Sequence, residues 1–170
     1  MVWQTSKERI PREAQQKPPL ILVVGLGNVL FQDDGVGVHL IRKLKKDPIP
    51  KIVYAEVGTA VLGALHLIEW ADKILAIDAM QAGGRPGTIY SSGVDNAENP
   101  GAKESLHGKT LLSAFKFLSR KNPPATRILG IEPENLAFGL DLSPSVQASL
   151  PQVIHTVRTI LRIWMKQYEG

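Results

Sequence analysis

Two carboxylates and one imidazole are the side chains of this sequence best suited to chemistry. Asp34 lies between a glycine-flanked apolar run and an expected helix, and Asp78 closes the apolar run KILAID. His107 follows the capping residue Ser105 into a first helical turn, where the helix dipole disfavours the imidazolium. Two carboxylates and a neutral imidazole suit a borderline divalent metal, and the same set could perform acid–base catalysis on a water molecule.

Each of these residues also has a purely structural interpretation. Asp33 or Asp34 could cap the following helix, which is the interpretation we favour for Asp33, and Asp78 could form a turn. His107 could be a solvated residue at a helix start. The remaining histidines fall inside expected helices, and we interpret them as core or surface residues: His39, His66 and His155. The spacing in the sequence does not by itself bring the three candidates together.

The common nucleotide and nucleophile motifs are incomplete or absent. The stretch GLGNVLFQDDGVG begins like a dinucleotide fingerprint, but Leu30 stands at the third glycine position and two acids follow. Gly108-Lys109-Thr110 resembles the end of a P-loop, but Lys103 stands where its first glycine should be. The chain has no cysteine, no Gly-x-Ser-x-Gly elbow and no His-Glu-x-x-His helix. These absences exclude a thiol nucleophile, a zinc–thiolate site and an iron–sulfur cluster.

The composition is that of one globular domain. The 170 residues are 44% apolar and 21% charged, and the net charge is +4. All of this excess lies in the two ends, because residues 20–149 hold thirteen basic and thirteen acidic side chains. A nucleic-acid partner is therefore not expected. No apolar run is long enough to span a bilayer, and the polar start is no secretory signal, so we expect a cytoplasmic protein without a membrane partner.

Strands and helices alternate along the chain and must position these residues. Apolar runs ended by glycine or turn residues predict strands over residues 20–25, 52–57, 73–79, 88–91 and 126–131. Apolar residues at helical spacing predict helices over 34–44, from a Thr59 cap to Trp70, from the Ser105 cap to Asn122, and from a Ser143 cap to about Lys166. Pro151 should kink the last helix or split off its first turn.

This alternation predicts an α/β fold with a mainly parallel five-stranded sheet between helices. Functional sites in such folds lie beyond the carboxyl ends of the strands, which here means segments 25–37, 56–59, 78–84 and the loop after Ile131. We divide the chain into a polar N-terminal extension, residues 1–18, and a domain over 19–170. Residues 93–103, rich in Gly, Asn, Asp and Pro, are expected to form a mobile loop.

Four blocks in order resemble the hydrogenase maturation proteases, which process the large subunit of nickel–iron hydrogenases. GLGNVLFQDDGVG is similar to the glycine–asparagine and acid–glycine signature of that family, AIDA to its second acidic site and SLHGKTLL to its histidine site. ILGIEPENLAFGLDLSPSV resembles its late strand, loop and helix start, so that the resemblance covers about residues 20–165. One segment departs: Val57 stands in Glu56-Val57-Gly58-Thr59 where the family often has a glycine.

The resemblance implies an endopeptidase that removes the C-terminal extension of a nickel–iron hydrogenase large-subunit precursor after nickel insertion. Asp34, Asp78 and His107 match the two acids and the histidine of the family's site, and would be both catalytic and metal-contacting. Nickel would belong to the substrate and be bound transiently as a recognition element, with no other cofactor. The implied fold is a single three-layer, phosphorylase/hydrolase-like α/β domain, which we expect to act as a monomer.

Two other functions remain compatible with these residues. A related aspartate-dependent peptidase, such as the germination proteases of spores, would act without nickel and would not need His107. A non-cleaving metal-binding or chaperone-like module would hold the hydrogenase precursor and leave its mass unchanged. For a peptidase, we expect water to attack a metal-polarised carbonyl with the help of Asp34 or Asp78.

Overall fold

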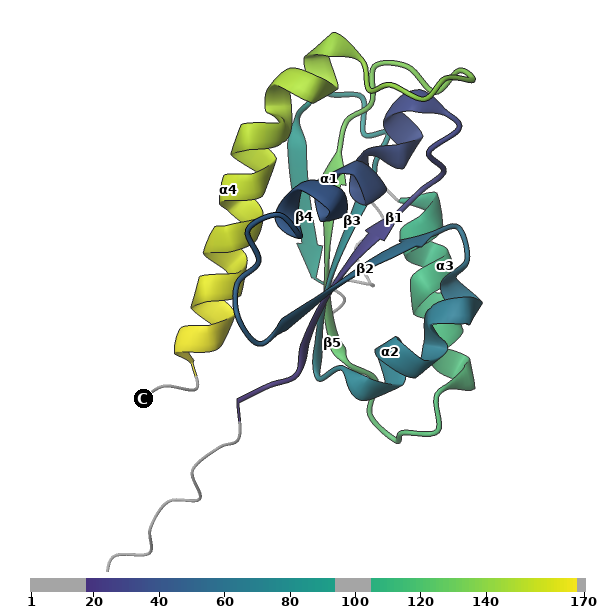
Figure 1. Ribbon diagram of the computed structural model, residues 1–170. Coiled ribbons are helices and arrows are strands. Elements are labelled where there is room, and N and C mark those ends of the chain that lie inside the picture. The colour runs from purple at the N-terminus through teal and green to yellow at the C-terminus, as the bar shows by residue number, and fades with distance from the viewer. Residues whose placement is uncertain (1–17, 94–104, 168–170) are drawn as a thin grey trace, which may run out of the picture.

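A five-stranded sheet is the centre of the computed structural model, which describes residues 18–93 and 105–167 (Figure 1). Its strands are β1 (Ile21–Leu26), β2 (Ile52–Gly58), β3 (Lys73–Ala79), β4 (Ile89–Gly93) and β5 (Ala125–Ile131). They lie in the order β2-β1-β3-β5-β4, and only the edge strand β4 runs antiparallel to its neighbour. The prediction of one α/β domain with a mostly parallel five-stranded sheet is confirmed.

Helices cover both faces of this sheet. Helices α1 (Val36–Leu44) and α4 (Pro144–Lys166) pack on one face. Helices α2 (Leu65–Trp70) and α3 (Leu106–Ala114) pack on the other, and Figure 1 shows them across the sheet from α4. In the two described ranges, three short 3-10 turns precede or follow these helices: η1 (Gln32–Gly35), η2 (Val61–Ala64) and η4 (Phe115–Phe117).

The central strands β1 and β3 are apolar along almost their whole length because both of their faces are buried. Successive side chains of a strand point to opposite faces, so each strand contributes to two cores. Val23 and Ile77 pack beneath α1 and α4, whereas Val24 and Ala76 pack beneath α2 and α3. The apolar runs that identified these strands in the sequence are therefore explained by the three-layer packing.

Two serine caps have the predicted geometry. The hydroxyl of Ser105 accepts a hydrogen bond from the N–H of Gly108, and that of Ser143 accepts one from Val146. In both helices the capping side chain satisfies one backbone donor that the first turn leaves without a partner.

Two expectations about helices are wrong. Thr59 caps no helix: Ala60 occupies the N-cap position without a side-chain hydrogen bond, and the segment starts as the 3-10 turn η2. The helix after Ser105 ends at Ala114 and is followed by η4, well before Asn122. Of the two effects expected of Pro151, the split is not seen, because α4 runs as one helix over Pro144–Lys166.

Two sequence-based expectations concern segments outside the described residues. The N-terminal extension over 1–18 lies there except for Pro18, and the expected loop over 93–103 lies there except for Gly93. Within the two described ranges, no helix is both long and apolar enough to cross a membrane.

The sheet order places a topological switch point between the carboxyl ends of β1 and β3, and we refer to this place as the crevice. The chain leaves β1 through α1 on one face of the sheet, whereas it leaves β3 through β4 and then α3 on the other face to reach β5. Connections that leave two neighbouring strands on opposite faces mark the switch point, where α/β proteins bind their ligands. The segment after β1 carries Asp34, and the end of β3 carries Asp78.

Candidate active site

Asp34, Asp78 and His107 lie together at this switch point. Nδ1 of His107 is 3.1 Å from Oδ1 of Asp78, and Nε2 of the same ring is 3.9 Å from Oδ2 of Asp34. The imidazole therefore lies between the two carboxylates. The structure brings together residues that are 29 or more positions apart in sequence and that the spacing alone could not join.

Asp78 is held by three hydrogen bonds and has no exposed surface. Its Oδ1 faces His107 and accepts from the N–H of Ala79 at 2.9 Å, while its Oδ2 accepts from the hydroxyl of Ser105. The same hydroxyl caps α3 by accepting from Gly108 at 2.9 Å. Ser105 therefore joins the helix that carries His107 to the strand that carries Asp78.

Asp34 is positioned by the turn that follows β1. Its Oδ2 accepts a hydrogen bond of 2.7 Å from the N–H of Asn28. Gly27 has a φ of 99°, and a Cβ at that position would overlap the backbone oxygen of Asp34. Glycine is therefore required here both for the left-handed backbone and for the close approach. The glycine–asparagine part of the sequence motif serves to place a backbone donor against Asp34.

The three side chains differ in their access to solvent. The side chain of Asp34 is 22% exposed and that of His107 is 18% exposed, whereas that of Asp78 is fully buried. Asp34 and the Nε2 edge of the imidazole can thus meet a substrate. Asp78 lies behind the ring, where it can orient the imidazole.

The two carboxylates raise the pKa of His107 above its ordinary value. The hydrogen bond with Asp78 is the largest cause; burial of the ring opposes it, and the charges of Asp78 and Asp34 add to the rise. The expectation that the helix start would disfavour the imidazolium is therefore wrong. A dipole acts weakly at a distance, whereas a carboxylate in hydrogen-bond contact favours the charged ring directly.

Asp33 has a structural role other than the expected cap. It makes no capping hydrogen bond to η1, and its buried carboxylate instead accepts from the loop after β5. Oδ2 accepts from the N–H groups of Glu134 and Asn135 at 2.9 and 3.0 Å, and Oδ1 accepts from Ser143 at 2.7 Å. Neighbouring acids thus have different functions, since Asp33 holds a loop and Asp34 faces the crevice.

Sequence reasoning missed Glu132, a buried carboxylate one residue beyond β5. It accepts hydrogen bonds from the N–H groups of Ala82 and Gly83 at 2.8 and 3.1 Å and from the hydroxyl of Tyr90 at 2.8 Å. Burial would raise the pKa of Glu132, but these donors outweigh it and lower the pKa. Glu132 fixes the loop that follows Asp78. An acid closing an apolar strand, the signal that identified Asp78, would have found it.

The donor geometry fits one metal ion between Asp34 and His107. Two donors bonded to one ion at about 2.1 Å each lie at most ~4.2 Å apart, and the observed separation is 3.9 Å. Asp78 binds the other ring nitrogen, as carboxylates behind metal-bound histidines do. No group of three acids or histidines in the described part of the chain forms a ready-made metal cage. Such an ion would need ligands from elsewhere.

A hollow of about 310 Å³ adjoins the crevice beside β2. Gly27 and Asn28 line it together with the Gly58-Thr59 segment and with Arg42 and Glu56, which form a salt bridge of 2.9 Å. Gly58 has a φ of 60°, a left-handed conformation that favours glycine. This segment therefore has its glycine at the position where the backbone requires one. Val57, which departs from the expected glycine, is buried in the core under α2.

Comparisons with known proteins agree on one family. The family profile described as hydrogenase maturation protease matches residues 38–160, a range that includes Asp78 and His107 and begins just after Asp34. The hydrogenase expression/formation protein HupD of Rhizobium leguminosarum bv. viciae is 31% identical over 156 residues, which cover 86% of this chain and 76% of that protein. The delta subunit of the coenzyme F420 hydrogenase of Methanothermobacter thermautotrophicus is 28% identical, with coverage of 81% and 91%.

Solved structures share the fold. The hydrogenase maturating endopeptidase HybD from Escherichia coli superimposes with a TM-score of 0.72 at 25% identity, covering 84% of this chain and 91% of that one. The [NiFe] hydrogenase maturation protease HybD from Thermococcus kodakarensis has a TM-score of 0.71 at 23% identity, with coverage of 82% and 97%. The second likeness is one of fold alone.

Proposed function

Because the chain belongs to the hydrogenase maturation protease family, we propose that it removes the C-terminal extension of a nickel–iron hydrogenase large-subunit precursor after nickel insertion. The observation that carries this proposal is the imidazole of His107 held between two carboxylates at the switch point of the sheet. The sequence resemblance to the family's acid and histidine sites agrees with it. We further propose that the protein acts as a cytoplasmic monomer, which gel filtration and cell fractionation test.

The substrate-borne nickel is recognised by Asp34 and His107 in this proposal. Their two donor atoms face each other across 3.9 Å, and both side chains are accessible. Asp78 accepts a hydrogen bond from Nδ1–H of His107, which leaves the lone pair of a neutral imidazole on Nε2. Nickel would bring its remaining ligands from the precursor, which accounts for a site that is not a complete metal cage. Asp34, Asp78 and His107 are thus the proposed metal-contacting and catalytic set, with Asp78 acting through the ring.

Asp34 is the better placed of the two acids to assist water. Its carboxylate is partly exposed, whereas both oxygens of Asp78 are occupied by buried hydrogen bonds. In this mechanism a water oxygen attacks the scissile carbonyl carbon while Asp34 takes one of its protons. Breaking the carbon–nitrogen bond then returns a proton to the leaving amine. The products are the mature large subunit and the free C-terminal peptide.

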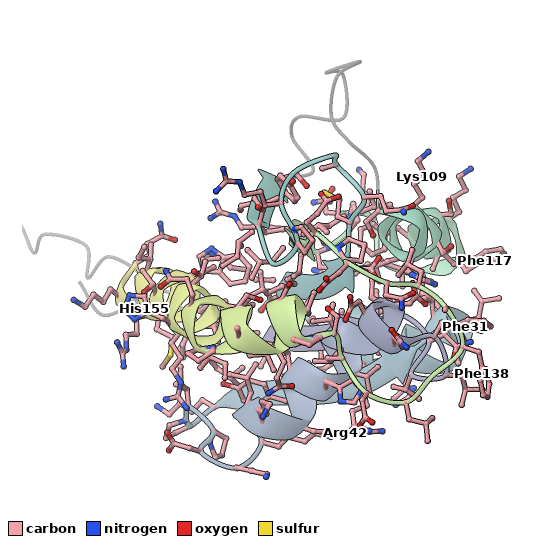
Figure 2. The ribbon with its side chains drawn as sticks, turned by 90° about the horizontal axis from the view of Figure 1, so that it is seen from above. Phe31, Arg42, Lys109, Phe117, Phe138 and His155 are labelled. Atoms are coloured by element: carbon pink, nitrogen blue, oxygen red, sulfur yellow. The ribbon has the colours of Figure 1, made fainter. Side chains whose placement is uncertain are left out.

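The test is the intact mass of a nickel-loaded precursor after co-expression with wild-type protein and with His107→Ala. Wild type should lower the mass by that of a C-terminal peptide, and His107→Ala, Asp34→Asn and Asp78→Asn should leave the precursor whole. His155→Ala is a matched control, because His155 is exposed on α4, away from the α3 side of the molecule (Figure 2). It should cleave like wild type.

Three results would contradict the proposal. Cleavage that continues without nickel and with His107→Ala would indicate an aspartate-dependent peptidase of another kind. A precursor that co-purifies with wild-type protein at unchanged mass would indicate a binding or chaperone-like module. Equal loss of activity in His107→Ala and His155→Ala would overturn the site.

A further inference from the structure

Four large apolar side chains are exposed on two neighbouring loops at the carboxyl end of the sheet. Leu30 and Phe31 follow β1, and Phe138 and Leu140 precede α4; their exposed fractions are 46%, 41%, 75% and 62%. Figure 2 shows Phe31 and Phe138 side by side at one edge of the molecule. The other large apolar residues exposed in the described ranges belong to other elements: Leu62 to η2, Trp70 to α2, Phe117 to η4 and Ile163 to α4. We call the first group the apolar loop surface.

Backbone hydrogen bonds fix the two loops to each other. The N–H of Gly139 donates to the carbonyl of Leu30 at 2.9 Å, and the N–H of Gln32 donates to the carbonyl of Gly139 at 2.8 Å. Phe31 and Gly139 form a parallel bridge, and the rings of Phe31 and Phe138 meet edge to face at 6.3 Å. The apolar side chains therefore stand on a defined backbone.

The same loops are continuous with the candidate active site. Asn28, two residues before Leu30, donates to Asp34, and Asp33 binds the loop that carries Phe138 through the N–H groups of Glu134 and Asn135. A ligand on the apolar loop surface would thus be held at a fixed distance from Asp34.

We propose that the apolar loop surface is a docking site for an apolar segment of the protein substrate, bound alongside the scissile bond. This inference rests on the proposed function, because the occupant is the hydrogenase large-subunit precursor. The continuity of the surface with the crevice assigns that occupant. A protease that cuts one bond in a large protein needs contacts beyond the reacting atoms, and exposed aromatic residues supply them with little loss of conformational entropy.

Other occupants fit the surface less well. Four side chains are far fewer than the about 20–30 residues that each partner contributes to a stable dimer interface. The surface can nevertheless add to a contact that the crevice already makes with a substrate. The chain's own residues 1–17 are also a less suitable occupant. They join the domain at the start of β1, which lies at the opposite end of the sheet from these loops (Figure 1).

The test compares Phe138→Ser with Phe117→Ser in cleavage of purified nickel-loaded precursor. Both phenylalanines are largely exposed, but Phe117 lies in η4 outside the surface. Phe138→Ser removes an aromatic contact that docking of the precursor would bury. It should therefore raise KM about 10-fold or more and leave kcat nearly unchanged. Phe117→Ser should match wild type in both constants. Equal thermal unfolding of both variants shows that the fold is kept.

A binding assay distinguishes failure of the docking site from failure of the proposed function. Asp78→Asn protein, which keeps both side chains proposed to face the nickel, should capture the intact precursor, and the double variant with Phe138→Ser should capture it about 10-fold more weakly. An unchanged KM and unchanged capture would overturn the docking site, as would a fall in kcat alone. A wild-type dimer that Phe138→Ser converts to monomer, with KM unchanged, would assign the surface to self-association. If wild type captures the precursor without cutting it, the proposed function fails, and the capture assay still decides the surface.

Discussion

The adjacent residues Asp33 and Asp34 illustrate how contacts, and not residue types, set chemical roles. Asp33 and Asp34 are adjacent, yet Asp33 is buried against three backbone donors while Asp34 is partly exposed and faces His107. The sequence identified Asp34, Asp78 and His107 because each lies at the start or the end of a predicted element, where α/β folds carry their sites. It could not predict the order of the cluster, with the imidazole in the middle, because that order depends on side-chain rotamers.

The ionisation of His107 gives the first prediction. Because Asp78 raises the pKa of the ring, metal-free protein should keep the imidazolium above pH ~6.5, the ordinary value. The pair then stabilises the fold fully below that pH, and this contribution is lost as pH rises through the raised pKa. Nickel binding needs the neutral ring, so cleavage should increase as pH rises through the same pKa. An NMR titration of His107 in wild type and in Asp78→Asn, where the pKa should fall, checks this.

Two outcomes would contradict that assignment. A titration of His107 that is the same in wild type and Asp78→Asn would show that the hydrogen bond does not control the ring. A pH profile of cleavage that falls on going from acid to neutral pH would show that the imidazolium, and not the imidazole, is the active form.

Ser105 should matter for activity beyond its effect on stability. Ser105→Ala removes a helix cap, which costs about 1 kcal/mol, and also removes a hydrogen bond to Asp78. Ser143→Ala is a matched control, because Ser143 caps α4 through its side chain without touching the three site residues. In urea unfolding both variants should lose the stability of one cap, and Ser105→Ala should lose more because Asp78 also loses a donor. Only Ser105→Ala should lower kcat, by about 10-fold or more. Equal kcat values in the two variants would show that Ser105 acts only as a helix cap.

At the level of elements, predictions succeeded where burial decides the pattern. The strand over 73–79 has the predicted bounds, because its continuous apolar run can only be accommodated between two layers of helices. The helix after Ser105 was predicted too long, because Phe115 and Leu118 continue the apolar spacing of a helix. In the structure the α-helix ends at Ala114, and the 3-10 turn η4 follows it. Such ends depend on packing against α2 and the sheet, which periodicity does not report.

The loop between β5 and α4 depends on one carboxylate from a distant element. Asp33→Asn keeps the shape of the side chain but leaves one acceptor oxygen for three backbone donors. Hydrogen bonds to a charged group contribute about 1.5–3 kcal/mol each, so we expect a loss of several kcal/mol. Hydrogen exchange should accelerate first at the amides of Glu134, Asn135 and Ser143. Retained protection at these amides would contradict the role of Asp33, and Asp47→Asn, at a largely exposed side chain, is the control.

For the whole molecule, the sequence predicted the layers and the edge at which the site lies, since both follow from strand order and burial. It did not predict the apolar loop surface. Leu30 and Phe138 are far apart in sequence, and neither lies in a periodic element, so nothing in their spacing indicates that they share a surface. Only the pairing of the two loops, held by Asp33, brings them together beside the crevice.

The two ends of the sheet give a final prediction about residues 1–17. The chain enters β1 at the end opposite the crevice, where Leu20 pairs with Asp72 through two hydrogen bonds, to its backbone and its side chain. A protein that starts at Pro18 keeps this pairing, so its thermal stability, KM and kcat for the precursor should match those of the full chain. If the shortened protein folds normally but its KM rises while kcat is kept, then residues 1–17 also contact the substrate. The docking surface would in that case extend beyond the apolar loop surface, along the length of the sheet, because the two contacts would lie at its opposite ends.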